Sequence, residues 1–284
     1  MKTKRAILPL LLALFGPSAR GETLPVAPRL GVQLWSVKDE LRRDFDGVLI
    51  KLAQMGFQGV EFAGQFGPYR QNPVALRALL DRSGLACAGA HVDIRQLAPQ
   101  HFEATTAFYR TLGCNNLVIS ADRRGTTPEL VTELGRELTT LSATLATQGM
   151  RIGYHNHAQE MAGTMGSTPW DLIAQNTPAE VILQQDVGWT VFAGKNPVTY
   201  VQRYPGRSVS MHLKAKLPVG AAGKPLIGQD GTDWKGLVSA AHQVGGTQWL
   251  IVEQEEYPDG MGQLDAVRTS LTGLRSAVTN LNRR

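Results

Sequence analysis

The sequence has little cysteine, few aromatic residues and no long apolar stretch after its first twenty residues. Only 2 of its 284 residues are cysteine and 7% are aromatic, so a small scaffold held together by disulfides is excluded. With 43% hydrophobic and 19% charged residues, the chain is neither a disordered polymer nor a collagen. A chain of this length can bury about three quarters of its unfolded surface, which suffices for one large domain or two small ones.

Excess positive charge is also scarce outside the first residues. The formal net charge is +5, but residues 1–21 hold Lys2, Lys4, Arg5 and Arg20 and no acid, which leaves +1 for the rest of the chain. Nucleic-acid binding relies on clustered Lys and Arg side chains that contact phosphates. We therefore predict no nucleic-acid partner.

The first 21 residues have the organisation of a secretory signal peptide. A positive start precedes the apolar run Ala6–Phe15, and Ala19 and Gly21 are small residues at the positions that signal peptidase reads. About ten apolar residues are too few to span a bilayer. We expect cleavage after Gly21, a mature chain of residues 22–284, and a secreted or periplasmic protein without membrane association. The alternative is an uncleaved anchor that lies in the membrane interface.

Export would permit a disulfide between the two cysteines. Cys87 and Cys114 both stand next to apolar, strand-like runs. Two buried thiols fit these surroundings at least as well as a disulfide does. The sequence leaves both possibilities open.

Short apolar, β-branched runs alternate with longer helix-patterned segments along the mature chain. Several helical segments begin with a proline after a capping residue, as at Thr127-Pro128, and several end at a glycine, as at Gly56. The expected strands are Leu30–Trp35, Gly59–Phe62, Ala86–Val92, Asn116–Ser120, Arg151–His155, Glu180–Gln185, Ser208–Leu213 and Trp249–Glu253. The expected helices are Phe45–Met55, Pro73–Ser83, Phe102–Leu112, Pro128–Gln148, Pro169–Gln175, Pro197–Arg203, Trp234–Val244 and Leu264–Leu281.

Eight strand-then-helix units predict parallel strands that are joined by helical crossovers. About 260 residues is the usual size of a closed (β/α)₈ TIM barrel, so we predict this α/β fold as a single domain. A doubly wound open sheet is the competing fold. No Gly-rich phosphate-binding fingerprint follows the first expected strand to support it.

Ionisable residues stand where the expected strands end. In a parallel barrel, side chains at the carboxyl ends of the strands point into the mouth, where barrel enzymes keep their catalytic residues. Four of the six histidines stand at these ends, namely His91, His155, His157 and His212. Other residues at the strand ends are Gln33, Trp35, Glu61, Asp186, Lys214, Glu253 and Glu255.

Imidazoles and carboxylates on successive strands suit one divalent cation. Side chains two residues apart share a face of a strand, so His155 points with His157 and Glu253 points with Glu255. A single such residue is better explained as a satisfied core histidine or a loop cap, but their coincidence on strands five to eight favours a metal site. We predict one ion of Mn, Zn, Co, Fe or Mg, with its identity left open.

At these residues the sequence resembles the xylose isomerase-like (β/α)₈ barrels, the group of sugar phosphate isomerases and epimerases. The resemblance covers nearly all of the mature chain, and its short motifs follow in the expected order. These motifs are Gly31–Leu41, Gly59–Phe62, Gly153–His157, Asp186–Trp189, His212–Lys214, Asp233–Lys235 and Ile251–Gln254.

The resemblance implies metal ligands on strands five to eight, where relatives commonly carry Glu, Asp, His and Glu. The matching positions are His155, Asp186, His212 and Glu253. His155 replaces a carboxylate of many relatives, so the site has one negative charge less. Glu160 matches an acid that one branch of the family carries shortly after this strand, and it is the alternative ligand. Ala215 stands where the group often has Asp, so the role of that carboxylate is missing here.

A metal in this mouth would support removal of a proton next to a sugar carbonyl, with an enediolate as the intermediate. The candidates for acid, base or oxyanion-holding roles are Glu253, His91, His157, Lys214 and Glu61. The candidates for substrate contact are Gln33, Trp35, Asn156, Trp189 and Glu160. We predict an isomerase or epimerase that acts on a small carbohydrate. Elimination, as in inosose dehydratases and lyases of 3-keto-glycosides, is the close alternative.

Two other classes compete with this prediction. The family also includes abasic-site endonucleases, but the nearly neutral body and the leader argue against DNA as the substrate. A non-catalytic carbohydrate-binding barrel would keep the mouth and lack the metal. Export would also favour free sugars or oxidised glycosides over phosphorylated sugars, which are cytoplasmic metabolites.

Overall fold

The structure is a computed structural model that describes residues 27–279, so the predicted signal peptide lies outside the described residues. Its strands are β1 (Arg29–Gln33), β2 (Gly59–Phe62), β3 (Ala86–Val92), β4 (Asn116–Ile119), β5 (Arg151–His155), β6 (Ile182–Gln184), β7 (Ser210–Leu213) and β8 (Trp249–Val252). Its α-helices are α1 (Lys38–Arg43), α2 (Phe45–Met55), α3 (Pro73–Ser83), α4 (Pro99–Leu112), α5 (Pro128–Ala146), α6 (Pro169–Gln175), α7 (Val187–Phe192), α8 (Pro197–Arg203), α9 (Trp234–Gln243) and α10 (Gln263–Val278).

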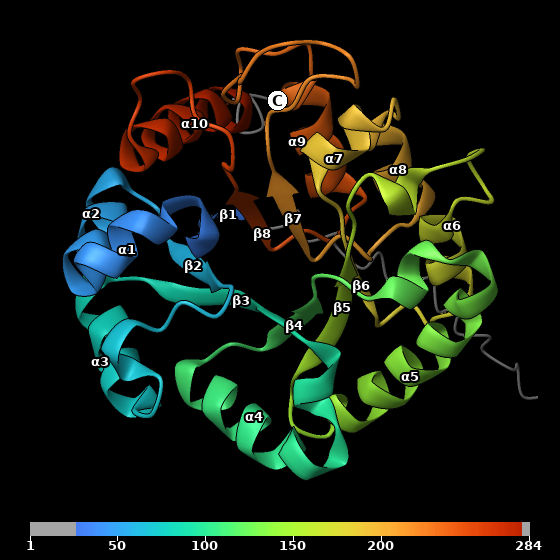
Figure 1. Cartoon of the computed structure of the whole chain (residues 1–284), viewed down its shortest axis with the longest axis horizontal. Helices are drawn as coiled ribbons and strands as arrows, with labels where there is room; N and C mark the ends of the chain where they lie inside the picture. The colour runs from blue at the N-terminus through green and yellow to red at the C-terminus, as the bar shows by residue number, and fades with distance from the viewer. Residues whose placement is uncertain (1–26, 280–284) are drawn as a thin grey trace, which may run out of the picture.

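The eight strands form a parallel barrel that the helices surround (Figure 1). The strand order is β6-β5-β4-β3-β2-β1-β8-β7. The strands at the two ends of this order, β6 and β7, share fewer backbone hydrogen bonds than the other neighbouring strands do. Asp186 and His212 form a parallel bridge between them, and the His212 N–H donates to the Gln185 carbonyl at 2.9 Å. These contacts close the sheet, and they confirm the predicted single-domain (β/α)₈ fold.

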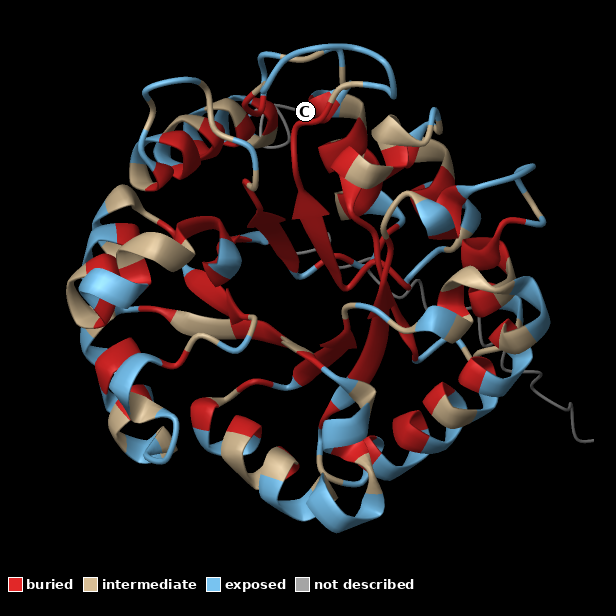
Figure 2. Ribbon diagram, viewed as in Figure 1, coloured by how far each residue is buried: buried red, intermediate tan, exposed pale blue. Residues whose placement is uncertain are grey.

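Local signals fix where the helices begin and end. Asn72 caps α3 by accepting the Ala75 N–H at 3.0 Å, and Pro73 follows at the first helical position, where its missing N–H costs nothing. Gly84 ends the same helix with a φ of +72°, a conformation that only glycine adopts readily. Buried residues line the strands and the inner faces of the helices (Figure 2), so the apolar periodicity of the helices points to the barrel.

The structure differs from the sequence-based expectation in a few elements. Strand β1 ends at Gln33 and the chain turns into the 3₁₀ helix η1 (Leu34–Val37), because the Gln33 side chain accepts the Trp35 N–H. Helix α7 was not predicted; it begins after Asp186, whose carboxylate accepts the Trp189 N–H at 2.8 Å. Helix α1 was also missed, because its six residues are too few to show a clear apolar period.

Cys87 and Cys114 form a disulfide, which decides between the two possibilities that the sequence left open. Their Cα atoms are 5.0 Å apart, at the amino-terminal ends of β3 and β4 and thus opposite the mouth of the barrel. Among residues 27–279, no helix combines the length and the apolar character that a membrane span requires.

Candidate active site

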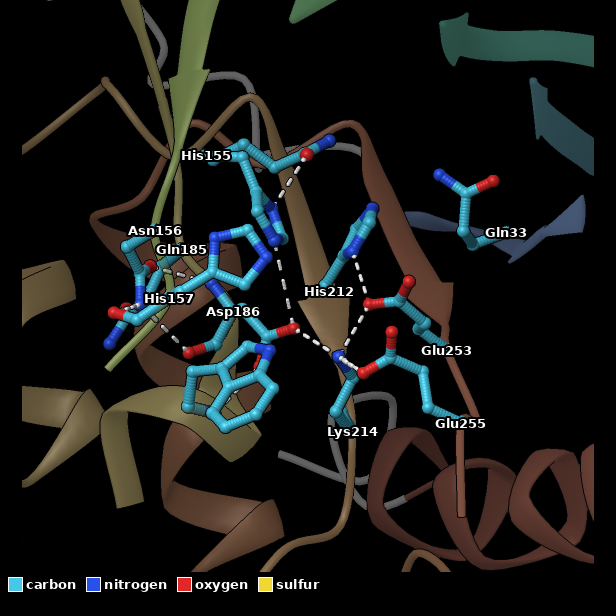
Figure 3. A network of polar contacts seen from close by, with 12 residues as sticks. Gln33, His155, Asn156, His157, Gln185, Asp186, His212, Lys214, Glu253 and Glu255 are labelled. Carbon is cyan, nitrogen blue, oxygen red and sulfur yellow. Dashed lines mark hydrogen bonds and ion pairs between the residues drawn. The ribbon is translucent and has the colours of Figure 1, made fainter. Parts of the chain in front are cut away.

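The carboxyl ends of the strands surround a cavity of about 440 Å³ at the mouth of the barrel. This volume lies within the usual range for small-molecule sites. Seven of the predicted site residues line it: Gln33, Trp35, His91, His155, His157, Lys214 and Glu253. Figure 3 shows most of them converging from different strands, together with Asp186, His212 and Glu255.

The four residues that the family resemblance implied as metal ligands lie together below this mouth. One ligand atom from each of His155, Asp186, His212 and Glu253 lies within 4.8 Å of the others, and all four residues are buried. His91, His155 and His212 form an overlapping group of three imidazoles. Strands that are up to a hundred residues apart in the chain therefore present two nitrogen and two oxygen donors to one point.

His212 lies between two carboxylates. Its Nε2 atom is 2.5 Å from Glu61 Oε2, and its Nδ1 atom is 2.9 Å from Glu253 Oε2. Burial by itself would lower the pKa of this imidazole, but Glu61 and Glu253 raise the pKa to about 10. Without a metal, His212 is therefore an imidazolium at neutral pH.

Lys214 supplies a second positive charge to the same group. Its side chain is 4% exposed, and its ammonium lies 3.0 Å from Asp186, 2.9 Å from Glu253 and 2.6 Å from Glu255 (Figure 3). Burial opposes the charge, yet the three carboxylates raise the pKa of Lys214 above its ordinary value. In turn, burial would raise the pKa of Glu253, but Lys214 and His212 hold it well below its usual range. Glu253 is therefore ionised.

Asp186 is fixed by its backbone and by one of its two carboxylate oxygens. The Asp186 N–H donates to the Asn156 side chain at 2.8 Å, and Oδ1 accepts the Trp189 N–H at 2.8 Å. The buried Oδ2 atom accepts no hydrogen bond within the described chain, although Lys214 stands 3.0 Å away. Burial raises the pKa of this carboxyl despite Lys214. Oδ2 is thus a buried oxygen with free lone pairs that faces the other three ligand candidates.

Gln184 orients the neutral imidazoles, and it is not among the residues predicted from the sequence. Its amide oxygen lies 2.7 Å from His91 Nε2 and 3.1 Å from His155 Nδ1, while its amide nitrogen donates to Glu61 at 2.7 Å. Because an amide oxygen only accepts, His155 carries its proton on Nδ1 and presents the lone pair of Nε2 toward Asp186 Oδ2, 3.9 Å away. Burial lowers the pKa of both His91 and His155. The alternation of strand side chains, which puts Gln184 on the face of Asp186, was the signal that could have identified it.

The other predicted residues occupy different places around this group. Gln33 donates to Glu61 at 2.7 Å, and Trp35 is 40% exposed at the rim. The His157 ring lies between the His155 ring at 5.1 Å and the Trp189 ring at 5.8 Å.

Glu160 and Asn156 are both buried. Glu160 accepts hydrogen bonds from the Tyr154 hydroxyl at 3.1 Å and the His157 N–H at 2.9 Å. It lies outside the four-residue group, in which His155 takes part.

This donor set fits a divalent cation. It offers imidazole and carboxylate atoms in a buried space, among them Asp186 Oδ2, whose one close polar contact is the ion pair with Lys214. The positive charges of Lys214 and His212 offset the repulsion between the carboxylates of Asp186 and Glu253. A divalent cation that replaced the His212 proton would be bound by the same two carboxylates without a large rearrangement.

A buried cluster of imidazoles and carboxylates, with donor atoms of the kind that hold divalent metals, lies at the mouth of this parallel (β/α)₈ barrel. The family of xylose isomerase-like TIM barrels matches residues 49–277, and the chain belongs to this family. The family resemblance found in the sequence is thereby confirmed.

Individual proteins are more distant. The chain is 25% identical to the rhizopine catabolism protein MocC of Rhizobium meliloti, over 86% of each chain. It is 22% identical to an inosose dehydratase of Clostridium botulinum, over 75% of this chain and 83% of the relative. A crystal structure of a sugar phosphate isomerase/epimerase from Parabacteroides distasonis has a TM-score of 0.71 and 24% identity, over 86% of this chain and 96% of the other.

Proposed function

We propose that the protein is a metal-dependent carbohydrate isomerase or epimerase that removes a proton from the carbon next to a carbonyl group. The observation that carries this proposal is the convergence of His155, Asp186, His212 and Glu253 beside a cavity of sugar size. Bound there, a divalent ion would act as a Lewis acid on the sugar carbonyl and its neighbouring hydroxyl.

Glu253 is the strongest candidate for the base. It lines the cavity, and Lys214 and His212 keep it ionised, which is the form that a general base requires. Such positioned general bases contribute roughly 10²–10⁴-fold to a rate. Lys214, 2.9 Å from Glu253, can donate a hydrogen bond to the oxygen that becomes negative in the enediolate.

A second proton-transfer group is available for returning the proton. His91 lines the same cavity, and its neutral imidazole can take up a proton from solvent and deliver it to the enediolate. Return of a proton to the same carbon from its other face gives an epimer, and return to the neighbouring carbon gives an isomer. His157, which also lines the cavity, is the alternative group.

Dehydration is the second candidate function, and one observation favours it. Two relatives named inosose dehydratase, 22% and 24% identical, match 75% and 60% of this chain. The same first step would serve, because an enediolate can also expel a hydroxyl from the next carbon. The leader predicts export, which we retain as a proposal and which favours free sugars over phosphorylated ones.

Proton exchange in D₂O tests the step that both candidates share. A panel of aldoses, ketoses, inososes and 3-keto-glycosides is incubated with the Mn²⁺-loaded protein, and deuterium next to the carbonyl is measured by NMR. We expect exchange with one substrate class, its loss in EDTA, and its loss in Asp186→Asn. The matched control is Asp233→Asn, because Asp233 is an exposed helix cap and asparagine caps equally well. Exchange that survives both EDTA and Asp186→Asn would refute the metal-dependent mechanism.

The products then separate the two outcomes. An epimer or isomer supports the first candidate, and an unsaturated or dehydrated product supports the second. Sugar binding that persists in EDTA without any exchange would instead identify a carbohydrate-binding module.

A further inference from the structure

The cavity at the mouth continues into a second one beside it. Trp35 and Gly64 line both, so they form the boundary between the two. The second cavity has a volume of about 510 Å³, which is more than a single small substituent of a sugar would need. Leu41, Phe45 and Phe66 give it an apolar surface.

Four basic side chains line this second cavity: Lys38, Arg42, Arg43 and Arg70. None of the lining residues within the described chain is acidic. Two of the four are already neutralised, because Arg42 pairs with Asp39 and Arg43 pairs with Glu40.

The other two cations have no carboxylate partner among residues 27–279. Lys38 holds its ammonium 4.3 Å from the centre of the Trp35 ring. Arg70 holds its guanidinium 5.6 Å from the centre of the Phe66 ring and donates to the Gly64 carbonyl at 3.1 Å. Aromatic rings thus fix both cations at the edge of the cavity while their charges remain available.

Two other cavities that adjoin the mouth differ in charge. In the one next to Gln96, Arg95 pairs with Asp93. In the one next to Trp189, the basic residue Arg123 stands with two acids, Asp122 and Glu160. Of these cavities, the one beside Trp35 combines uncompensated cations with an apolar surface.

We propose that this second cavity binds a negatively charged sugar ring, so that the substrate is an acidic disaccharide or glycoside. The assignment of the reacting ring to the first cavity rests on the proposed function. The apolar surface of Phe66 and Leu41 suits the C–H face of a sugar ring, and Lys38 and Arg70 suit a carboxylate on it. Trp35, 40% exposed at the boundary, lies where the glycosidic bond would cross.

Calorimetric binding of two disaccharides at low salt tests this inference without any turnover. Cellobiouronic acid and cellobiose differ only in whether one ring carries a carboxylate. Each charge pair strengthens binding by up to about fivefold, so two pairs should make the acidic disaccharide bind up to about 25-fold more tightly. Arg70→Gln and Lys38→Gln should each reduce this preference by up to about fivefold, and 0.5 M NaCl should largely abolish it. The matched control is Lys235→Gln, an exposed lysine on α9 that should leave the preference unchanged.

Two results would overturn the inference. The first is that the two disaccharides bind equally tightly, or that neither binds detectably. The second is that Arg70→Gln and Lys38→Gln, with wild-type melting temperatures, both leave the preference for the acidic disaccharide unchanged. Glucose 6-phosphate serves as a third ligand. If it binds as tightly as cellobiouronic acid and depends equally on Arg70, a single charged sugar reaches the cations and the second-ring assignment is wrong. If the protein prefers the acidic disaccharide but catalyses no proton exchange, the second-cavity assignment stands and the proposed function is wrong. Failure of the one proposal can therefore be told apart from failure of the other.

Discussion

Replacement of Lys214 by methionine should destabilise the metal-free protein strongly. The ammonium lies within 3.0 Å of carboxylate oxygens of Asp186, Glu253 and Glu255, and the first two of these residues are nearly inaccessible to water. Methionine fills a similar volume but removes the charge. Two buried carboxylates are then left with His212 as the nearest remaining cation, and only Glu253 contacts it directly.

The size of the effect follows from the cost of an uncompensated buried charge. Removal of one partner of a buried ion pair typically costs about 3–5 kcal/mol of the free energy of unfolding. For a domain of this size, the loss lowers the melting temperature by on the order of 10 °C. Lys216→Met is the matched control, because Lys216 contacts one carboxylate, that of Glu256, which is 48% exposed. Because that carboxylate stays half exposed to water, the Lys216 pair contributes about 1 kcal/mol or less.

Thermal melting with and without Mn²⁺ is the assay. In EDTA, Lys214→Met should melt well below the wild type and below Lys216→Met. Saturating Mn²⁺ should raise the melting temperature of Lys214→Met more than that of the wild type, because the ion and the ammonium compensate the same carboxylates. Equal melting of the two variants in EDTA would refute the electrostatic reasoning. Equal Mn²⁺ shifts in wild type and Lys214→Met would show that the ion binds elsewhere.

Three further predictions concern the surroundings of the site. Gln184→Leu should weaken Mn²⁺ binding about 10- to 100-fold in calorimetry, because the amide that orients two imidazoles is lost; unchanged affinity would contradict this role. Asp171→Asn should lower the free energy of unfolding by about 1.5–3 kcal/mol at pH 7. Burial would raise the pKa of Asp171, but hydrogen bonds from Tyr204 and from the loop before α6 lower it. Its stabilisation is therefore present above the unfolded pKa of about 3.9 and is lost as the pH falls further, so urea melts of variant and wild type should converge near pH 2. Replacing both Cys87 and Cys114 by alanine should lower the free energy of unfolding by about 3–4 kcal/mol, because the disulfide closes a loop with a sequence separation of 27. Proton exchange should be retained, because the disulfide lies opposite the mouth of the barrel. Loss of exchange in a folded variant would contradict this.

The repeating pattern of the sequence was enough to predict the barrel. Strand and helix signals depend on residues close together in the chain, such as the cap Asn72 before Pro73 and the glycine at position 84. The ends of parallel strands meet at one edge in any barrel, so the convergence of His155, Asp186, His212 and Glu253 was also within reach. The helix after Asp186 was missed because its cap lies in a segment that reads as the end of an apolar strand.

The sequence by itself therefore determined the fold class and the side chains that face the mouth, because periodicity and caps are local. The tertiary structure decided which of these side chains are partners. His212 contacts Glu61, 151 residues earlier in the chain, and Lys214 joins three carboxylates from two other strand ends. Such distances depend on the register between strands and on the closure of the barrel. The same holds for the cysteine pair and for the cationic cavity beside Trp35, since both arise where segments from different units pack together.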